Sequence, residues 1–229
     1  MEGSSAYGAS GRALPLYVLL DCSYSMTGAP IEALREGMQM LYDQLMDDPE
    51  TRSKVKISVI TFSDTATQTD LVPIKAFVAP MIEAKGVTRL DGALNLLAQS
   101  IQADVRLNTP TARGDYCPLV FMLTDGVPTD ENGYQSTLYK SEMTKINALR
   151  YNHKPMIIAL GCGPDVDATV LTDITSNVLY VRDVSGEKLR EYFQFISGSV
   201  QASARAGDSG AAVSLPPAPA GFTYNPSGS

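Results

Sequence analysis

The stretch LPLYVLLDCSYSM, residues 14–26, joins an apolar run to a group of oxygen-bearing side chains. The run LPLYVLL is typical of a strand that is buried on both faces of a sheet. It ends at Asp21, and Ser23 and Ser25 follow at alternate positions. In open parallel sheets, ligand sites form just beyond the carboxyl ends of the strands. The stretch therefore predicts both a buried strand and a binding site at its end.

Strand-like and helix-like segments alternate along the rest of the chain. The predicted strands are 55–63, 117–124, 154–163 and 177–183, and the predicted helices are 30–48, 89–106, 134–152, 167–174 and 186–201. This order predicts an α/β, Rossmann-like fold, with a mostly parallel central sheet and helices on both faces. A strand near residues 67–72 follows its predecessor after a short turn and is interrupted by Pro73, so we expect it to be an antiparallel edge strand.

Composition narrows the class of protein. The 229 residues are 44% hydrophobic and 19% charged, and the net charge of −7 argues against a nucleic-acid-binding or anionic-membrane-binding surface. Cys22, Cys117 and Cys162 form no CxxC pair, which argues against a disulfide framework or a zinc site and favours a reducing compartment. No signal-peptide layout or membrane-length apolar stretch is present. We expect a cytoplasmic protein without membrane insertion.

The composition changes at both ends of the chain. Residues 1–12 are small and polar and are expected to be flexible, and residues 13–201 are expected to form one domain. Residues 202–229 are rich in Pro, Gly, Ala and Ser, which predicts a disordered or extended tail. Deletion of this tail is expected to leave thermal stability nearly unchanged.

Two further segments place oxygen ligands near predicted strand or helix ends. Thr88 in GVTRLDGAL precedes a predicted helix, and Asp125 in LTDG directly follows a predicted strand. Hydroxyls combined with a few carboxylates suit hard cations, Mg²⁺ first and Ca²⁺ or Mn²⁺ as alternatives, rather than zinc or copper. Neutral hydroxyl ligands also leave positive charge on the ion for an incoming anion.

The motif DCSYS, together with Thr88 and Asp125, resembles the metal-ion-dependent adhesion site (MIDAS) of von Willebrand factor type A (vWA) domains. The resemblance covers about residues 14–200. It implies that Ser23, Ser25 and Thr88 contact the metal directly or nearly so, and that Asp21 and Asp125 act partly through water. It also implies that a partner protein supplies an Asp or Glu side chain to complete the shell.

Tyr24 departs from the family pattern, because this middle position is often glycine. Its phenol is a candidate partner contact, although a simple solvent-facing role is the alternative. Among vWA proteins, the segments LPLYVLLDCSYSM and SVITFS resemble the bacterial TerY-like group, which is associated with tellurite resistance and stress response.

Each part of the motif also has a simpler interpretation. Asp21 and Ser23 are favoured in turns, Thr88 is a typical helix N-cap, and TDG is a common turn. Only their combination at three separate points favours a metal site. Asp91 and Asp130 lie near these segments, and we expect them to serve in caps or turns rather than as direct ligands.

The leading functional hypothesis is a non-enzymatic, metal-dependent protein-binding module with no catalytic residue. A magnesium-dependent phosphohydrolase is the alternative, but it would need a second carboxylate where Ser23 stands, and His153 is the only histidine. A third hypothesis places the interaction in the proline-rich tail LPPAPAGFTYNP, with Phe222 and Tyr224 as candidate partner contacts.

Overall fold

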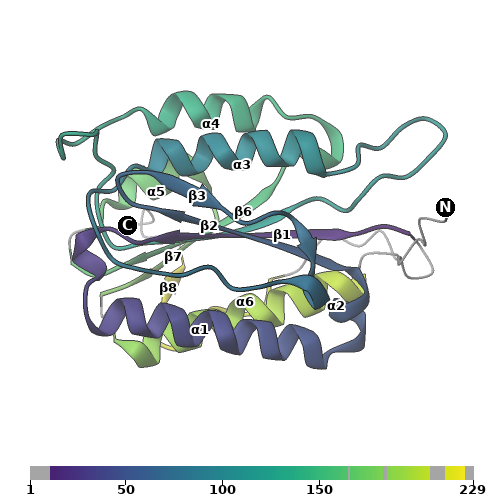
Figure 1. Cartoon of the computed structure of the whole chain (residues 1–229), viewed down its shortest axis with the longest axis horizontal. Helices are drawn as coiled ribbons and strands as arrows, with labels where there is room; N and C mark the ends of the chain where they lie inside the picture. Colours follow the sequence, from purple (N-terminus) through teal and green to yellow (C-terminus); the bar gives the residue numbers. More distant parts are fainter. Residues whose placement is uncertain (1–10, 165, 183–184, 207–214, 225–229) are drawn as a thin grey trace.

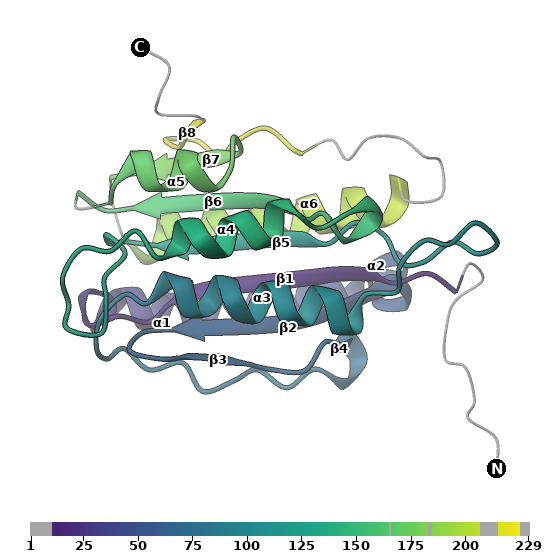
Figure 2. The same ribbon diagram turned by 90° about the horizontal axis from the view of Figure 1, so that it is seen from above.

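The central sheet lies between two layers of helices in the computed structural model, which describes residues 11–164, 166–182, 185–206 and 215–224 (Figure 1). Five strands are parallel, in the spatial order β2-β1-β5-β6-β7 (Figure 2). They are β1 (Leu14–Asp21), β2 (Val55–Phe62), β5 (Leu119–Thr124), β6 (Met156–Cys162) and β7 (Val178–Val181). The predicted α/β fold class is confirmed.

Short antiparallel strands form both edges of the sheet. On one side, β3 (Ala66–Gln68) and β4 (Val72–Pro73) pair with β2, as predicted for this segment. On the other side, β8 (Thr223–Tyr224) pairs with β7. The sequence did not predict this second antiparallel edge, because β8 lies within the segment assigned to the tail.

The helices cover both faces of the sheet (Figure 1). One layer contains α1 (Ala29–Asp47), α2 (Pro49–Lys54) and α6 (Gly186–Ala206), and the other contains α3 (Leu90–Asp104), α4 (Tyr139–Asn147) and α5 (Ala168–Ile174). Three short 3-10 helices, η1 (Tyr24–Met26), η2 (Ile74–Ala76) and η3 (Tyr151–His153), lie in the connections. None of the helices in the described residues is long and apolar enough to cross a membrane.

Strand β1 contributes to the apolar cores on both sides of the sheet. Leu16 and Val18 belong to the cluster that includes residues of α1 and α6, whereas Tyr17 and Leu19 belong to the cluster that includes α3, α4 and α5. All residues of β1 are buried, which explains its continuous apolar run. Burial on both faces also holds Asp21 at the carboxyl edge of the sheet.

Helix α4 is shorter than predicted, because a hairpin replaces its first part. The carboxylate of Asp130 accepts hydrogen bonds from the backbone N–H groups of Asn132 (2.8 Å) and Tyr134 (3.0 Å). Gly133 has a φ of 83°, which favours glycine in the turn, and Gln135 then pairs with Thr129 in an antiparallel bridge instead of starting a helix. The predicted helix over residues 134–152 was therefore wrong at its start, and at its other end the helix stops at Asn147.

Helix α6 is longer than predicted and continues to Ala206, beyond the expected domain boundary at residue 201. The helix continues because its last turns still bury side chains, including Val200 and Ala204. Residues 207–214 and 225–229 of the predicted tail lie outside the described residues, as do residues 1–10 of the predicted flexible N-terminus.

The described part of the predicted tail, residues 215–224, is extended and packs against the domain. Leu215 and Ala218 contact the apolar core, and Phe222 is buried within it. The ammonium group of Lys188 donates a hydrogen bond to the carbonyl of Ala220 (2.8 Å) and lies 5.7 Å from the centre of the Phe222 ring. The described part of the tail therefore adds buried apolar surface, so from the structure we expect its deletion to lower stability, unlike the expectation from composition.

Candidate metal-binding site

Asp21 is the buried anchor of the candidate site. Its Oδ1 accepts a hydrogen bond from the backbone N–H of Ser23 (2.9 Å), which folds the loop back over the end of β1. Its Oδ2 accepts a hydrogen bond from the hydroxyl of Thr124 (2.6 Å), at the end of the neighbouring strand β5. These contacts position the carboxylate between two parallel strand ends.

Ser23, Ser25 and Asp125 form a continuous chain of oxygen atoms. The Oγ atoms of Ser23 and Ser25 are 3.0 Å apart, and the hydroxyl of Ser25 donates to Oδ1 of Asp125 at 2.8 Å. Ser25 and Asp125 are 100 positions apart in the sequence. They meet because β1 and β5 are adjacent parallel strands that end at the same edge of the sheet.

Thr88 approaches the same group from a third loop. Its backbone N–H donates to the hydroxyl of Thr129 (2.9 Å), and its carbonyl accepts from the N–H of Thr129 (2.9 Å). A Cβ atom placed on Gly126 would lie 3.5 Å from Oγ1 of Thr88. The Thr88 hydroxyl is therefore close to the residue that follows Asp125, so the structure brings the predicted ligands of all three loops together.

Burial and like charge make an ionised Asp21 costly in the absence of a cation. Burial raises the pKa of Asp21 to about 6, the hydrogen bonds from Thr124 and Ser23 oppose this shift, and the charge of Asp125 reinforces it. A cation close to these carboxylates would favour their charged forms. The described residues contain no cluster of three or more His, Cys, Asp or Glu side chains that could hold a metal. The other oxygen atoms near the two carboxylates are hydroxyls, which suit a hard cation.

The sequence of this chain also matches a known protein family. The von Willebrand factor type A domain family matches residues 16–194. The chain belongs to the vWA domain family. No curated protein matches the chain in sequence.

Solved structures support the same fold at low sequence identity. Proximal thread matrix protein 1 (PTMP1) from the mussel byssus is 18% identical, with a TM-score of 0.60 over 82% of this chain and 48% of its own. A vWA protein from Catenulispora acidiphila is 16% identical, with a TM-score of 0.61 over 83% of this chain and 43% of its own. The pilus adhesin SpaC from Lactobacillus rhamnosus GG is 15% identical, with a TM-score of 0.64 over 84% of this chain and 31% of its own. This chain therefore spans less than half the length of each, and the likeness is one of fold.

A further PTMP1 structure contains a zinc-occupied MIDAS motif. It is 18% identical to this chain, with a TM-score of 0.58 over 82% of this chain and 48% of its own. The MIDAS motif of that protein therefore accepts zinc. The identity of a metal in this vWA domain remains a prediction.

Of the two neighbouring acidic residues, Asp130 takes a turn role, whereas Asp91 lies in the first turn of α3 and pairs with Arg89. Asp91 forms two hydrogen bonds with the guanidinium of Arg89, at 2.9 and 2.8 Å. The hydrogen bond from Arg89 lowers the pKa of Asp91 despite its partial burial. Asp130 closes the hairpin turn described above.

Only one of the three predicted partner contacts offers a described, exposed side chain. Tyr24 is 73% exposed beside the candidate ligands. The prediction that Phe222 contacts a partner is wrong in this structure, because its ring is packed into the core and beside Lys188. Tyr224 pairs through its backbone with Leu179, at the β7 side of the sheet.

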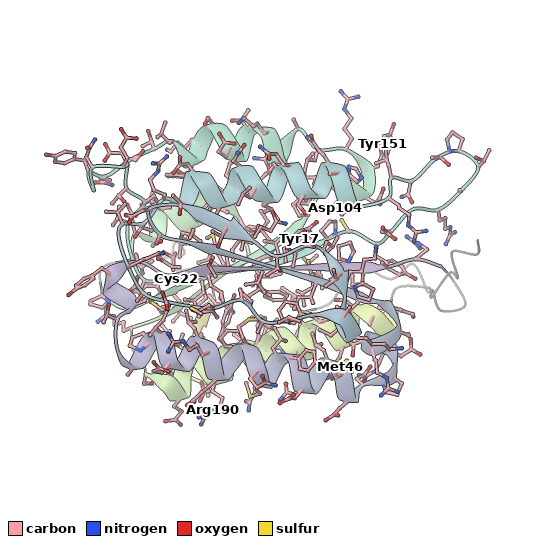
Figure 3. The ribbon with its side chains drawn as sticks, viewed as in Figure 1. Tyr17, Cys22, Met46, Asp104, Tyr151 and Arg190 are labelled. Atoms are coloured by element: carbon pink, nitrogen blue, oxygen red, sulfur yellow. The ribbon has the colours of Figure 1, made fainter. Side chains whose placement is uncertain are left out.

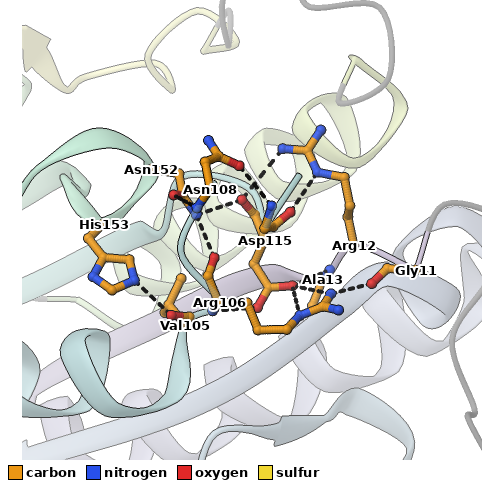
Figure 4. A network of polar contacts seen from close by, with 10 residues as sticks. Gly11, Arg12, Ala13, Val105, Arg106, Asn108, Asp115, Asn152 and His153 are labelled. Atoms are coloured by element: carbon orange, nitrogen blue, oxygen red, sulfur yellow. Dashed lines mark hydrogen bonds and ion pairs between the residues drawn. The ribbon is translucent and has the colours of Figure 1, made fainter. Parts of the chain in front are cut away.

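A polar network at the amino ends of the strands was not predicted (Figure 4). The guanidinium of Arg106 donates to Oδ1 of Asp115 at 2.6 and 3.0 Å, and the N–H of Ala13 donates to the same atom at 2.9 Å. Nε2 of His153 lies 2.7 Å from the carbonyl oxygen of Val105. The single histidine therefore lies near the ends of the strands opposite to Asp21. No local pattern marked this network, because Arg106 and Asp115 meet across an irregular loop, and Ala13 and His153 come from distant parts of the chain.

Proposed function

We propose that this vWA domain is a non-enzymatic protein-binding module that captures an acidic side chain of a partner through a bound divalent cation. The residues proposed to hold the cation are Asp21, Ser23, Ser25, Thr88 and Asp125. The observation that carries this proposal is the chain of hydrogen bonds from Asp21, through the backbone N–H of Ser23 and the hydroxyls of Ser23 and Ser25, to Asp125. Such a cluster of carboxylates and hydroxyls matches the ligands that hard cations prefer.

Each residue has a physical role in this proposal. Asp21 is fixed from both sides and supplies buried negative charge, while Ser23 and Ser25 supply neutral oxygen atoms. Asp125 links the β5 loop to Ser25. A bound ion would supply positive charge that a partner carboxylate can approach. Because the shell has only two carboxylates of its own, it does not cancel that charge as fully as a more acidic shell would.

Mg²⁺ is the ion we propose, with Ca²⁺ or Mn²⁺ as alternatives, because hydroxyl and carboxylate oxygens dominate the site. A bacterial stress-response or tellurite-resistance setting is a proposal that rests on the sequence resemblance alone. A cytoplasmic location is a proposal that rests on the cysteine pattern and the composition of the sequence.

Phosphohydrolase activity is the less favoured alternative. Ser23 occupies the position where a second carboxylate would be needed, and its hydroxyl lies 3.0 Å from that of Ser25. His153 contacts Val105 at the other end of the sheet, so it cannot act as an acid or base beside Asp21. Magnesium-dependent hydrolysis of generic phosphoesters that is lost in Asp21→Asn would support this alternative over our proposal.

Direct metal binding tests the proposal without a known partner. The full chain is stripped with EDTA and titrated with Mn²⁺, and the free ion is followed by electron paramagnetic resonance, with Mg²⁺, Ca²⁺ and Zn²⁺ as competitors. We expect one bound ion in the wild type and loss of binding in Asp125→Ala. Asp43→Ala, an exposed position on α1, is the matched control and should bind normally. Equal binding by all three proteins would refute the assigned site.

A further inference from the structure

Large exposed apolar side chains gather on the loops that carry the candidate ligands. Within the described residues, the large apolar side chains that are exposed are Tyr24, Val78, Met81, Leu107, Tyr134, Leu138 and Tyr151. Four of these, Tyr24, Met81, Tyr134 and Leu138, lie on the loops around residues 22–28, 81–89 and 125–138. Val78 lies apart from them, shortly after η2, and the strand that precedes η2, β4, pairs with the first residues of β2. Exposed apolar groups that cluster in this way mark interaction surfaces.

Tyr24 is held in place by its backbone while its ring stays in solvent. Its N–H donates to the carbonyl of Gly86 (2.9 Å), and its carbonyl accepts from the hydroxyl of Thr27 (2.6 Å). The residue stands between Ser23 and Ser25 in the sequence, so its exposed ring belongs to the same short loop as two of the proposed ligands. A rigid backbone and few side-chain torsions mean that the ring can pack on a partner at low entropic cost.

Tyr134 lies on the hairpin that contacts the loop of Thr88. The hairpin is joined to this loop by the paired contacts of Thr129 with Thr88, and a Cβ atom on Gly133 would lie 3.4 Å from Val87. Tyr134 is 73% exposed, as much as Tyr24. Two equally exposed tyrosines therefore stand on two different ligand-bearing loops.

Met81 borders a hollow next to the loop of Asp21. The cavity has a volume of about 220 Å³, and its walls include Met81, Cys22, Ser63 and Lys85. The backbone N–H of Lys85 donates to the carbonyl of Cys22 (2.9 Å), which ties this wall to the loop of the candidate ligands. The hollow can receive a side chain of a segment that is bound at the metal.

The charges around the site disfavour a strongly acidic partner. Asp64, Glu83 and Glu131 are exposed on the surrounding loops. Oδ1 of Asp64 accepts from the N–H of Val87 (2.9 Å), one residue before Thr88. Glu83 and Lys85 both line the hollow, so the one positive charge of Lys85 offsets only part of the negative charge of the three acids. A partner carboxylate is attracted to the ion itself, but further partner acids would meet these carboxylates and be repelled.

We propose that the partner segment presents a single carboxylate flanked by aromatic or aliphatic residues, and not a run of acidic residues. Tyr24 and Tyr134 pack against the flanking side chains, and the hollow beside Met81 receives one of them. This inference rests on the proposed function, since the ion determines where the partner carboxylate lies.

Four fluorescein-labelled heptapeptides test the inference by fluorescence polarisation with the EDTA-stripped or Mg²⁺-loaded full chain. Three have a central Asp flanked on both sides by Leu and Phe, by Ser, or by Glu, and the fourth has Asn between Leu and Phe. We expect the Leu/Phe-flanked Asp peptide to bind about fivefold more tightly than the Ser-flanked one, a difference of about 1 kcal/mol. The Glu-flanked peptide should bind most weakly, and the Asn peptide should not bind.

The variants Tyr24→Ala and Tyr134→Ala should each reduce the preference for the Leu/Phe-flanked peptide while leaving Mn²⁺ binding unchanged. Tyr151→Ala is the matched control, because Tyr151 is 74% exposed and lies at the opposite end of the molecule from Cys22 (Figure 3). It should retain the full preference.

The outcomes separate the inference from the proposed function. If the three Asp peptides bind equally and EDTA abolishes their binding, the inference is overturned and the proposed function stands. If no Asp peptide binds more tightly than the Asn peptide in Mg²⁺, both are overturned. If the Leu/Phe-flanked Asp peptide still binds in EDTA, its binding is apolar and independent of the ion, and the inference is also overturned.

Discussion

The two ends of the sheet hold polar clusters of opposite character. At the amino ends, the buried carboxylate of Asp115 is balanced by the guanidinium of Arg106. At the carboxyl ends, the buried carboxylate of Asp21 accepts hydrogen bonds from a backbone N–H and the hydroxyl of Thr124. The first cluster supplies its own cation, whereas the second is built from groups that would bind one.

The pKa values of the two aspartates express the same difference. Burial tends to raise the pKa of Asp115, but hydrogen bonds from Arg106 and from backbone N–H groups outweigh this effect and lower it. Burial dominates for Asp21 and raises its pKa to about 6. A buried carboxylate that is paired with a cationic side chain contributes to the stability of the fold. A buried carboxylate that lacks such a side chain is suited to binding a metal ion. We therefore assign a structural role to the amino end and a binding role to the carboxyl end.

The largest expected effect on stability is at the amino end. Asp115→Asn should lower the free energy of unfolding by about 3 kcal/mol, because it removes the charge of a buried carboxylate that accepts hydrogen bonds from the half-exposed guanidinium of Arg106 and from two backbone N–H groups. Denaturant unfolding measures this change. The variant should still bind Mn²⁺ normally, and loss of metal binding would show that the two ends are not independent.

The pH dependence of the unfolding free energy tests the structural role of Asp115. Because the pKa of Asp115 is lowered in the folded state, its contribution is present above the unfolded pKa of about 3.9 and is lost as pH falls through the folded value. The unfolding free energy of the wild type should therefore fall more steeply below about pH 4 than that of Asp115→Asn. Parallel curves for the two proteins would contradict this role of Asp115.

The carboxyl end should stabilise the fold only when a cation is present. At a free Mg²⁺ concentration of about 100 times the dissociation constant, an ion that binds only the folded chain stabilises it by about 2.7 kcal/mol. Wild type should show this gain in thermal or denaturant unfolding, and Asp125→Ala should not. An equal gain in both proteins would place the ion elsewhere.

The C-terminal arm, residues 215–224, should contribute stability independently of both clusters. Phe222→Ala should lower the free energy of unfolding by about 2 kcal/mol, since it removes a buried aromatic ring. Leu107→Ala, an exposed apolar position, is the control and should change little. Unchanged stability in Phe222→Ala would mean that the arm is not packed in solution.

The smallest expected effect on folding is at Ser25. Ser25→Ala should change the unfolding free energy without metal by less than about 0.5 kcal/mol, because this hydroxyl is exposed. Ser25→Ala should nevertheless weaken Mn²⁺ binding. The control is Ser141→Ala, which changes an exposed serine on α4 and should bind Mn²⁺ normally. Unchanged binding in Ser25→Ala would remove this hydroxyl from the ligand set.

The sequence by itself determined the order and type of most helices and strands and the chemical type of the candidate ligands. Apolar periodicity is a local signal, so β1 and its neighbours could be predicted from short segments. The DCSYS motif, Thr88 and Asp125 could be chosen because oxygen-bearing side chains follow or precede these elements. Their agreement with one family pattern strengthened that choice.

Only the tertiary structure decided which distant groups meet. The contacts between Ser25 and Asp125, and between Arg106 and Asp115, depend on strand pairing and loop packing, which no local pattern encodes. The same holds for the C-terminal arm, whose Pro- and Gly-rich composition predicted a tail although Phe222 finds a buried site. Composition reports what a segment can do alone, whereas burial against the rest of the chain decides whether it becomes ordered.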